Sequence, residues 1–196
     1  QVGSFTMQLI GTGVAIAIAF VLTMVLGFDD IPNEAPAEEL IPAGPGAPEV
    51  AAPVSGAVVA LTEVKDKVFA SGALGNGIGI VPDNGLVYAP FAGTVVTAFP
   101  TGHAFGIKSA DGVEVLIHIG IDTVQLDGKG FTPAVTQGQA VETGDLLATI
   151  DLDTITAAGY DPTTIMVITN TAHYAAVIPA EGHHLTHGDT AIVIER

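Results

Sequence analysis

The stretch AFPTGHAFGIKSADGVEVLIHIGIDTV (98–124) decides the fold, because it reads as two apolar strands joined by a tight turn. Asp111 and Gly112 form an Asp-Gly pair, a strong short-range signal for a β-hairpin when alternating apolar residues flank it. Each strand also carries one imidazole, His103 before the turn and His118 after it. The stretch therefore predicts an antiparallel hairpin with two histidines.

The length of the turn decides whether the two imidazoles meet. If the Asp-Gly pair alone forms the loop, His118 lies opposite Phe105 and diagonal to His103, whereas a loop centred one residue earlier pairs His103 with His118 directly. Both registers put the histidines on one face with Leu116, about 5 to 8 Å apart. A three-residue loop would send them to opposite faces. We expect one of the first two registers.

From about Val50 onward the sequence is typical of an all-β domain. Short runs rich in Val, Ile, Thr and Ala are separated about every 8 to 12 residues by Gly, Pro, Asn or Asp. Two pairs of segments resemble each other, APVSGAVVAL (52–61) with APFAGTVVTAF (89–99) and GDLLATID (144–151) with GDTAIVIE (188–195). We predict an antiparallel β-sandwich of the barrel-sandwich type with an internal repeat. A helical turn is expected at LDTITAAGY (152–160).

The first 49 residues differ in composition from the rest. Residues 1–28 carry no charge, and the 22 residues from Met7 to Phe28 would rise about 33 Å as a helix, enough to cross a bilayer. A buried soluble helix is seldom apolar on every face, and a signal peptide usually starts with a basic region. Residues 29–49 hold five prolines and six acidic residues. We predict a transmembrane helix (1–28), an extended linker (29–49) and a β domain (50–196).

The charge balance and the missing motifs exclude several functions. Five Lys and Arg against 21 Asp and Glu give a formal net charge of −16, which repels a nucleic-acid backbone. No G-x-x-x-x-G-K-[ST] loop is present for a nucleotide. The chain has no cysteine, so thiol and disulfide chemistry are absent.

Two neighbouring imidazoles allow two kinds of chemistry. A neutral imidazole has one nucleophilic nitrogen, which can take a phosphoryl group while a second imidazole stabilises the phosphoryl oxygens. Neutral imidazoles also bind zinc, and His118 with Asp122 forms an H-x-x-x-D pair. The spacing alone leaves both alternatives open.

The region from about residue 51 to 196 resembles the glucose-type enzyme IIA domain of the phosphoenolpyruvate-dependent sugar phosphotransferase system. The resemblance is carried by APVSGAVVALTEVKDKVFA, GNGIGIVP, VYAPFAGTVV, PTGHAFGIKSADGVEVLIHIGIDTVQLDGKGF, VTQGQAVETGDLLATIDL and VITN. It implies an antiparallel β-sandwich, in agreement with the strand pattern.

The resemblance also implies roles for individual residues. His118 would take the phosphoryl group, His103 would assist, Thr101 would orient His103 by a hydrogen bond, and Asp122 would be the acidic neighbour. Gly102 departs from the family pattern and is expected to loosen the loop that holds Thr101.

An apolar rim is expected to dock partner proteins. The expected docking residues are Val68, Phe69, Phe99 and Phe105. The implied partners are the histidine-containing phosphocarrier protein, a IIB domain, and a IIC membrane domain whose end residues 1–28 resemble. The resemblance therefore places the domain at the C-terminal end of a fused permease, on the cytoplasmic side of the cell membrane. No cofactor or metal is expected.

Three other classes of protein share some of these sequence features. A secreted zinc peptidase of the lysostaphin-like type would also need an H-x-H pair, which the chain lacks. A lipoyl or biotinyl carrier needs a modifiable lysine in a setting that Lys108 does not have. The HHLTH cluster (183–187) is interpreted as loop histidines. A purely regulatory IIA-like module would use the same residues as a phosphocarrier, so it stays open.

Overall fold

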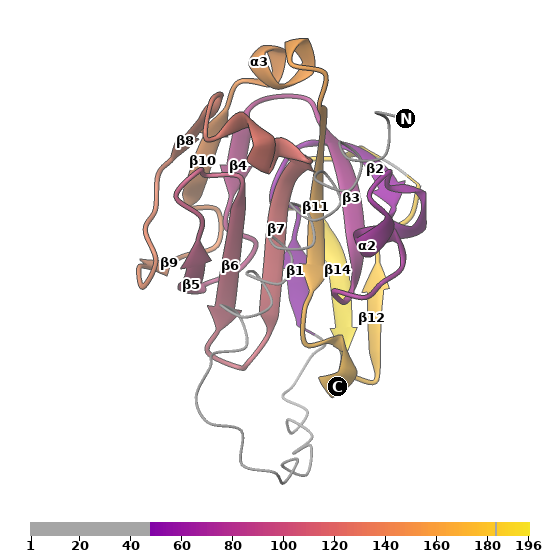
Figure 1. Cartoon of the computed structure of the whole chain (residues 1–196). Helices are drawn as coiled ribbons and strands as arrows, with labels where there is room; N and C mark the ends of the chain where they lie inside the picture. Colours follow the sequence, from indigo (N-terminus) through magenta and orange to yellow (C-terminus); the bar gives the residue numbers. More distant parts are fainter. Residues whose placement is uncertain (1–47, 183) are drawn as a thin grey trace, which may run out of the picture. The chain divides into compact units, whose positions relative to one another are not determined.

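Three antiparallel sheets make up residues 48–182 and 184–196, the part of the chain that the computed structural model describes (Figure 1). The largest sheet has eight strands in the order β13-β2-β3-β11-β7-β6-β5-β9. These strands are β2 (Gly56–Ala60), β3 (Asn76–Pro82), β5 (Gly93–Ala98), β6 (Ala104–Ser109), β7 (Glu114–Ile121), β9 (Ala140–Val141), β11 (Asp161–Ile168) and β13 (His184–Leu185).

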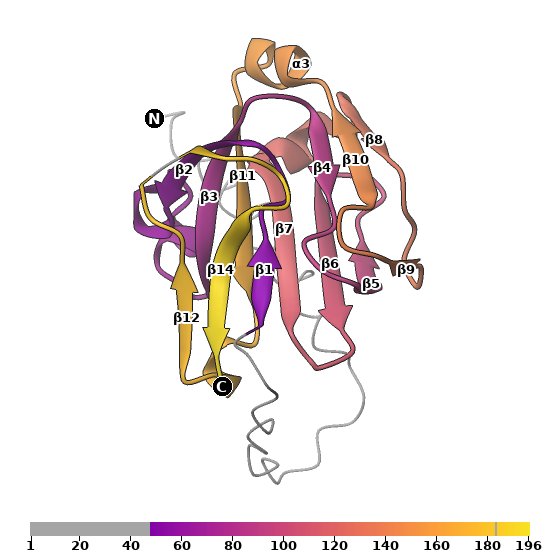
Figure 2. The same cartoon turned by 180° about the vertical axis from the view of Figure 1, so that it is seen from behind.

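Two three-stranded sheets complete the domain, in the orders β1-β14-β12 and β4-β10-β8. Their strands are β1 (Glu49–Ala51), β12 (Ala176–Pro179), β14 (Thr190–Glu195), β4 (Leu86–Tyr88), β8 (Phe131–Pro133) and β10 (Leu146–Ile150). In Figure 1 β1 and β14 lie behind the large sheet, and in Figure 2 they lie in front of it, so sheet packs on sheet. The all-β antiparallel prediction is confirmed.

The strand order repeats itself. Counted inward from the two edges of the large sheet, β13 and β9 occupy equivalent positions, as do β2 and β5, β3 and β6, and β11 and β7. The small sheets match in the same way, with β1, β14 and β12 corresponding to β4, β10 and β8. The predicted echoes fall on β2 with β5 and on β10 with β14, at equivalent places in the two halves. The second half, β4 to β10, is inserted whole between β3 and β11 of the first.

Short helices connect the strands. They are η1 (Leu61–Glu63), α2 (Lys67–Ala70), η2 (Thr123–Leu126), α3 (Leu152–Ala157) and η3 (Thr171–His173). Asp66 is the N-cap of α2 and Asp151 is the N-cap of α3: the first carboxylate accepts two backbone N–H groups, and the second accepts the Thr154 N–H. The helix α3 confirms the helical turn expected at 152–160.

The core lies between the sheets and follows strand alternation. On β7, Val115, Ile117 and Ile119 point into the core and are at most 2% exposed. Leu116 and His118 alternate with them and therefore lie on the other face of the large sheet. The helix α2 is drawn on that same face in Figure 1.

In the part of the chain that is described, no helix is long and apolar enough to cross a membrane. The predicted transmembrane helix (1–28) and nearly all of the predicted linker (29–49) lie outside the described residues. Only the last residues of the linker are described, and the strand β1 already begins at Glu49.

Candidate active site

His118 lies on β7, near the middle of the large sheet and next to a break in strand geometry. The strands β11 and β6 flank it, with Ile165 opposite on one side and Ala104 on the other. Two residues later, still within β7, the backbone turns locally at Gly120, which has φ 75°. This turn brings the Gly120 carbonyl back to the ring, where it accepts a hydrogen bond from His118 Nδ1 at 2.8 Å. Nδ1 therefore carries the proton, and Nε2 keeps a free lone pair.

The register of the hairpin differs from both expected registers. Ala104, not Phe105 or His103, lies opposite His118, because the loop holds three residues and Ser109 N–H bonds across it to the Val113 carbonyl. In a regular strand this register would put His103 on the face opposite His118. The predicted registers are therefore wrong.

The two imidazoles nevertheless meet, because His103 is not part of a strand. It precedes β6, in a bend where Gly102 has φ 71°. The bend turns the His103 ring towards His118, and the ring centroids lie 5.3 Å apart in an edge-on arrangement of 75°. The Ile119 N–H also donates to the His103 carbonyl at 2.7 Å, which links the two segments. The prediction that the two imidazoles lie together is confirmed. The bend at Gly102 brings them together, whereas the hairpin register alone would separate them.

Thr101 lies within hydrogen-bond distance of His103, as expected. Its Oγ1 lies 2.5 Å from His103 Nδ1. Gly102 does not prevent this contact, since its positive φ forms the bend that brings the two side chains together. The expected loosening of the loop is not observed.

Burial keeps both imidazoles uncharged. Burial, and secondarily the nearby His118, lowers the pKa of His103 to about 3. Burial also lowers the pKa of His118 below its ordinary value, although the bond to the Gly120 carbonyl and the charges of Asp66 and Asp122 act in the opposite direction. At neutral pH the site therefore holds two neutral rings.

Two carboxylates lie near the rings, and sequence reasoning identified only one of them. Asp122 is exposed in a left-handed conformation with φ 58°, directly before η2. Asp66 was missed. Its carboxylate accepts from Val68 N at 2.8 Å and from Phe69 N at 3.1 Å. The sequence did contain a signal, because an aspartate directly before a short helical run is typical of an N-cap.

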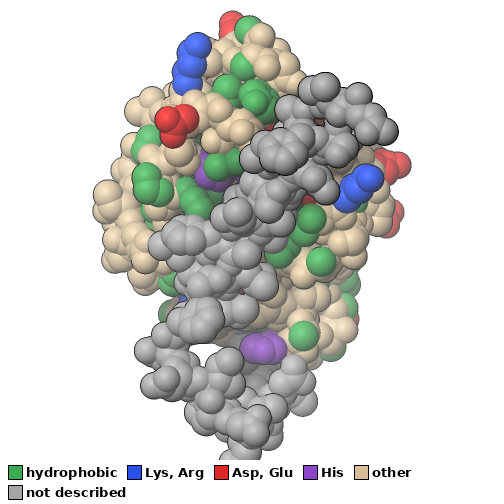
Figure 3. Space-filling model, viewed as in Figure 1, with side chains coloured by type: hydrophobic (Ala, Val, Ile, Leu, Met, Phe, Trp, Pro, Cys, Tyr) green, Lys and Arg blue, Asp and Glu red, His purple; other side chains and the backbone are tan. Residues whose placement is uncertain are grey.

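Aromatic side chains surround the imidazoles. The Phe69 ring lies 5.3 Å from the His118 ring, and the Phe99 ring lies 5.1 Å from the His103 ring. Phe99 and Val68 are partly exposed, whereas Phe69 is 4% exposed. On the face drawn in Figure 3, hydrophobic side chains lie beside a histidine.

Phe105 does not share this position. The observed register places it opposite Ile117, so it points into the core and is 0% exposed. It offers no surface to a partner, and its expected place on the histidine face is wrong.

Two other described histidines contact residues outside this site. His184 pairs with Asp83, and the His187 ring packs on Tyr88 at 4.2 Å. Among residues 48–182 and 184–196, no group of three or more His, Cys, Asp and Glu side chains could hold a metal ion. His183, part of the HHLTH cluster, lies outside the described residues.

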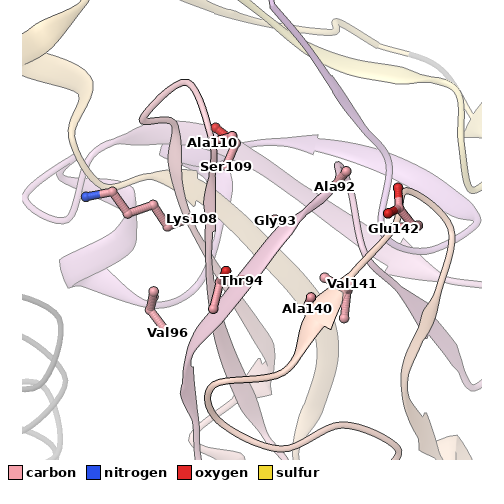
Figure 4. Close-up of a pocket in the computed structure, with 10 residues that line it drawn as sticks. All are labelled: Ala92, Gly93, Thr94, Val96, Lys108, Ser109, Ala110, Ala140, Val141 and Glu142. Carbon is pink, nitrogen blue, oxygen red and sulfur yellow. The ribbon is translucent and has the colours of Figure 1, made fainter.

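A shallow hollow of about 410 Å³ lies along β5, β6 and β9 (Figure 4). Small apolar side chains line much of it, and Lys108 and Glu142 lie on opposite sides in the view of Figure 4. Neither His103 nor His118 is among its lining residues, so it is separate from the candidate active site.

A neutral imidazole with one free ring nitrogen and a second neutral imidazole in contact with it suit the chemistry of a histidine phosphocarrier. The comparisons with known proteins agree with this class. A family profile described as the phosphoenolpyruvate-dependent sugar phosphotransferase system, EIIA 1, matches residues 48–174. The chain therefore belongs to this EIIA family.

Three relatives illustrate the range of the family. A glucose-specific EIIA component of Bacillus cereus is 41% identical over 144 residues, which cover 74% of this chain and 87% of that protein. A beta-glucoside-specific EIIBCA component of Bacillus subtilis is 42% identical over 172 residues, or 88% of this chain. The solved structure of glucose permease IIA from Mycoplasma capricolum has a TM-score of 0.69 and 40% identity, covering 75% of this chain and 95% of that one.

The chain spans only part of the fused relatives that it matches. It covers 28% of the length of the Bacillus subtilis EIIBCA component. The aligned 172 residues exceed the length of the region from residue 48 to the end, so the alignment includes part of residues 1–47.

Proposed function

We propose that this domain carries a phosphoryl group on His118 during sugar uptake. It accepts the group from the histidine-containing phosphocarrier protein and passes it to a IIB domain. The single observation that carries this proposal is the contact between two neutral imidazoles, with the proton of His118 held on Nδ1 by the Gly120 carbonyl. Membership of the EIIA family supports it as well.

The transfer step uses the free lone pair of His118. Nε2 attacks the phosphorus atom of the donor phosphohistidine, and an N–P bond forms as the donor's own N–P bond breaks. The electron pair of the broken bond returns to the donor imidazole. The hydrogen bond from Nδ1 to the Gly120 carbonyl stabilises the positive charge that develops on the His118 ring.

His103 acts as a donor to the phosphoryl oxygens. When Thr101 donates its hydroxyl proton to His103 Nδ1, the proton of the neutral ring lies on Nε2. With a pKa of about 3 the ring stays neutral, so it gives a hydrogen bond without competing as an acid. No metal or cofactor takes part in this step.

Partner proteins dock on the rim around the rings. Val68 and Phe99 offer partly exposed apolar surface, and the buried Phe69 ring packs against the His118 ring. Asp66 and Asp122 add negative charge beside this surface, which suits a partner with basic side chains around its own site.

The domain functions at the cytoplasmic side of the cell membrane, as part of a chain that includes a IIC domain. Two observations support this arrangement. Residues 1–28 are uncharged and long enough to span a bilayer, and the alignment with an EIIBCA component extends into residues 1–47. The membrane domain selects the sugar, so the identity of the sugar does not follow from the residues of this domain.

Labelled phosphate transfer tests the proposal. His118→Ala should accept no label from the phosphocarrier, because it lacks the nucleophile. His103→Ala should still accept label but pass it to a IIB domain about 100-fold more slowly, because one stabilising donor is lost from the transition state. Labelling of His118→Ala would refute the assignment of the nucleophile. A wild-type chain that accepts label but never passes it to any IIB domain would favour a purely regulatory role.

A further inference from the structure

Thr123 is a buried hydroxyl residue beside the candidate active site, and it takes no direct part in the proposed transfer step. It begins η2 and is 0% exposed. Its Oγ1 donates to the Ile119 carbonyl at 2.5 Å. A buried hydroxyl that reaches back to a strand carbonyl fixes the backbone at that point.

The position of Ile119 explains why this bond matters. The strand β6 begins at Ala104, which lies opposite His118, so the ladder between β6 and β7 ends there. Beyond that pair, the Ile119 N–H bonds to the His103 carbonyl, and the Ile119 carbonyl accepts from Thr123. Thr123 thus supplies to the Ile119 carbonyl the hydrogen bond that a neighbouring strand would give it further along the ladder. The bond to His103 therefore holds the peptide group before Ile119, and the bond from Thr123 holds the peptide group between Ile119 and Gly120.

Gly120 lies between this fixed peptide and the carbonyl that binds His118. The pairing of β7 with β11 shifts register between Asp161 and Thr164, so Gly120 has no regular partner in that ladder. A Cβ at Gly120 would collide with Thr123 Cγ2 and lie 3.0 Å from the Asp161 carbonyl oxygen. The Thr123 methyl therefore fills the space beside the glycine, while its hydroxyl holds the preceding peptide.

We propose that Thr123 is a positioning residue for phosphoryl transfer, whose hydroxyl holds the Ile119–Gly120 peptide so that the Gly120 carbonyl keeps the His118 proton on Nδ1. The consequence for catalysis rests on the proposed function. If the carbonyl turned away, part of the neutral His118 would carry its proton on Nε2, and that nitrogen would lose the lone pair that attacks phosphorus. Thr123 acts through Gly120 and does not touch the phosphoryl group.

Nitrogen-15 NMR of the full chain at pH 8 tests the proposal on the unphosphorylated protein. Thr123→Val keeps the shape of the side chain and removes the hydroxyl. The ratio of Nδ1–H to Nε2–H imidazole at His118 should then fall about fivefold, the effect of losing one net hydrogen bond. Thr123→Ser, which keeps the hydroxyl and loses the methyl, should retain the wild-type ratio.

Transfer kinetics give the second readout. Thr123→Val should slow label acceptance from the phosphocarrier in proportion to the fall in the fraction of His118 that carries its proton on Nδ1, and Thr123→Ser should accept label at the wild-type rate. A folded Thr123→Val chain with wild-type ratio and rate would overturn the proposal, as would a Thr123→Ser chain that changes as much as Thr123→Val. If Thr123→Val does not fold, Thr123→Cys replaces it, because cysteine is close to serine in size but is only a weak hydrogen-bond donor. Equal tautomer ratios at His118 in the Thr123→Cys and Thr123→Ser variants would then overturn the proposal. If wild-type His118 takes no label, the proposed function fails, but the tautomer result is unaffected.

Discussion

Acidification should destabilise this domain through His103, and the size of the effect follows from the site. The pKa of His103 falls from an ordinary 6.5 to about 3 because the ring is buried. As pH falls below 6.5, the unfolded chain binds a proton at this position and the folded chain does not. The contribution of His103 to the free energy of unfolding is therefore fully present above about pH 6.5, and it is lost as pH falls towards 3.

The magnitude can be worked out from these two values. Between pH 7 and pH 5, the unfolded His103 becomes almost fully protonated, and the folded His103 stays neutral. The free energy of unfolding should therefore fall by about 2 kcal/mol over this interval from His103 alone. The lowered pKa of His118 contributes in the same direction.

Urea unfolding followed by far-ultraviolet circular dichroism, at pH 7, 6 and 5, measures this effect. His103→Gln removes the titrating ring and keeps a polar side chain that can still bond to Thr101. The variant should lose about 2 kcal/mol less than the wild type between pH 7 and pH 5. His173→Gln, which removes an exposed imidazole outside the site, is the matched control and should follow the wild type.

Two results would refute the reasoning. One is a His103→Gln variant whose stability falls with pH as steeply as that of the wild type. The other is a His103 ring proton whose NMR shift titrates near pH 6.5 in the folded chain, which would mean that burial does not exclude the charged form.

Three further perturbations test the parts around the rings. Gly120→Ala should cost about 2 kcal/mol of stability, because an alanine there must keep φ 75° and collides with Thr123, whereas Gly138→Ala, at φ 87° with open space around it, should cost only about 1 kcal/mol in the same urea assay. Asp66→Ala should lose about 1 kcal/mol through the missing α2 cap, whereas Asp66→Asn should keep the cap and lower the pKa of His118 further in an NMR titration, because one negative charge is gone. Phosphate transfer should proceed unchanged in the presence of a chelator, and a chelator that stops turnover would favour a zinc site.

The strand content and the repeat could be predicted from the sequence because they depend on local patterns. Strand alternation separates Val115, Ile117 and Ile119 from His118, and the structure places those three side chains in the core. The echo between residues 52–61 and 89–99 marked equivalent strands in two halves of one fold. These features repeat over several residues, so a single irregular position does not hide them.

The register could not be predicted, because one residue in the turn decides it. The Asp-Gly pair favours a two-residue loop, but Ser109 Oγ also accepts the Val113 N–H at 2.9 Å and donates to Asp111. Asn170, far along the chain, donates to the Gly112 carbonyl and accepts from the Glu114 N–H. These contacts stabilise the three-residue loop, and the contact with Asn170 forms only in the folded domain.

The site itself depends on two places where the strands stop being regular. His103 reaches its partner because the chain bends at Gly102, and His118 keeps its proton on Nδ1 because the chain turns at Gly120. In ideal strands with the observed register, the imidazoles would lie on opposite faces and could not share a phosphoryl group. The chemistry therefore follows from the two glycines that bend the chain beside the histidines as much as from the histidines. A sequence search for this site should look for both pairs, His103 with Gly102 and His118 with Gly120.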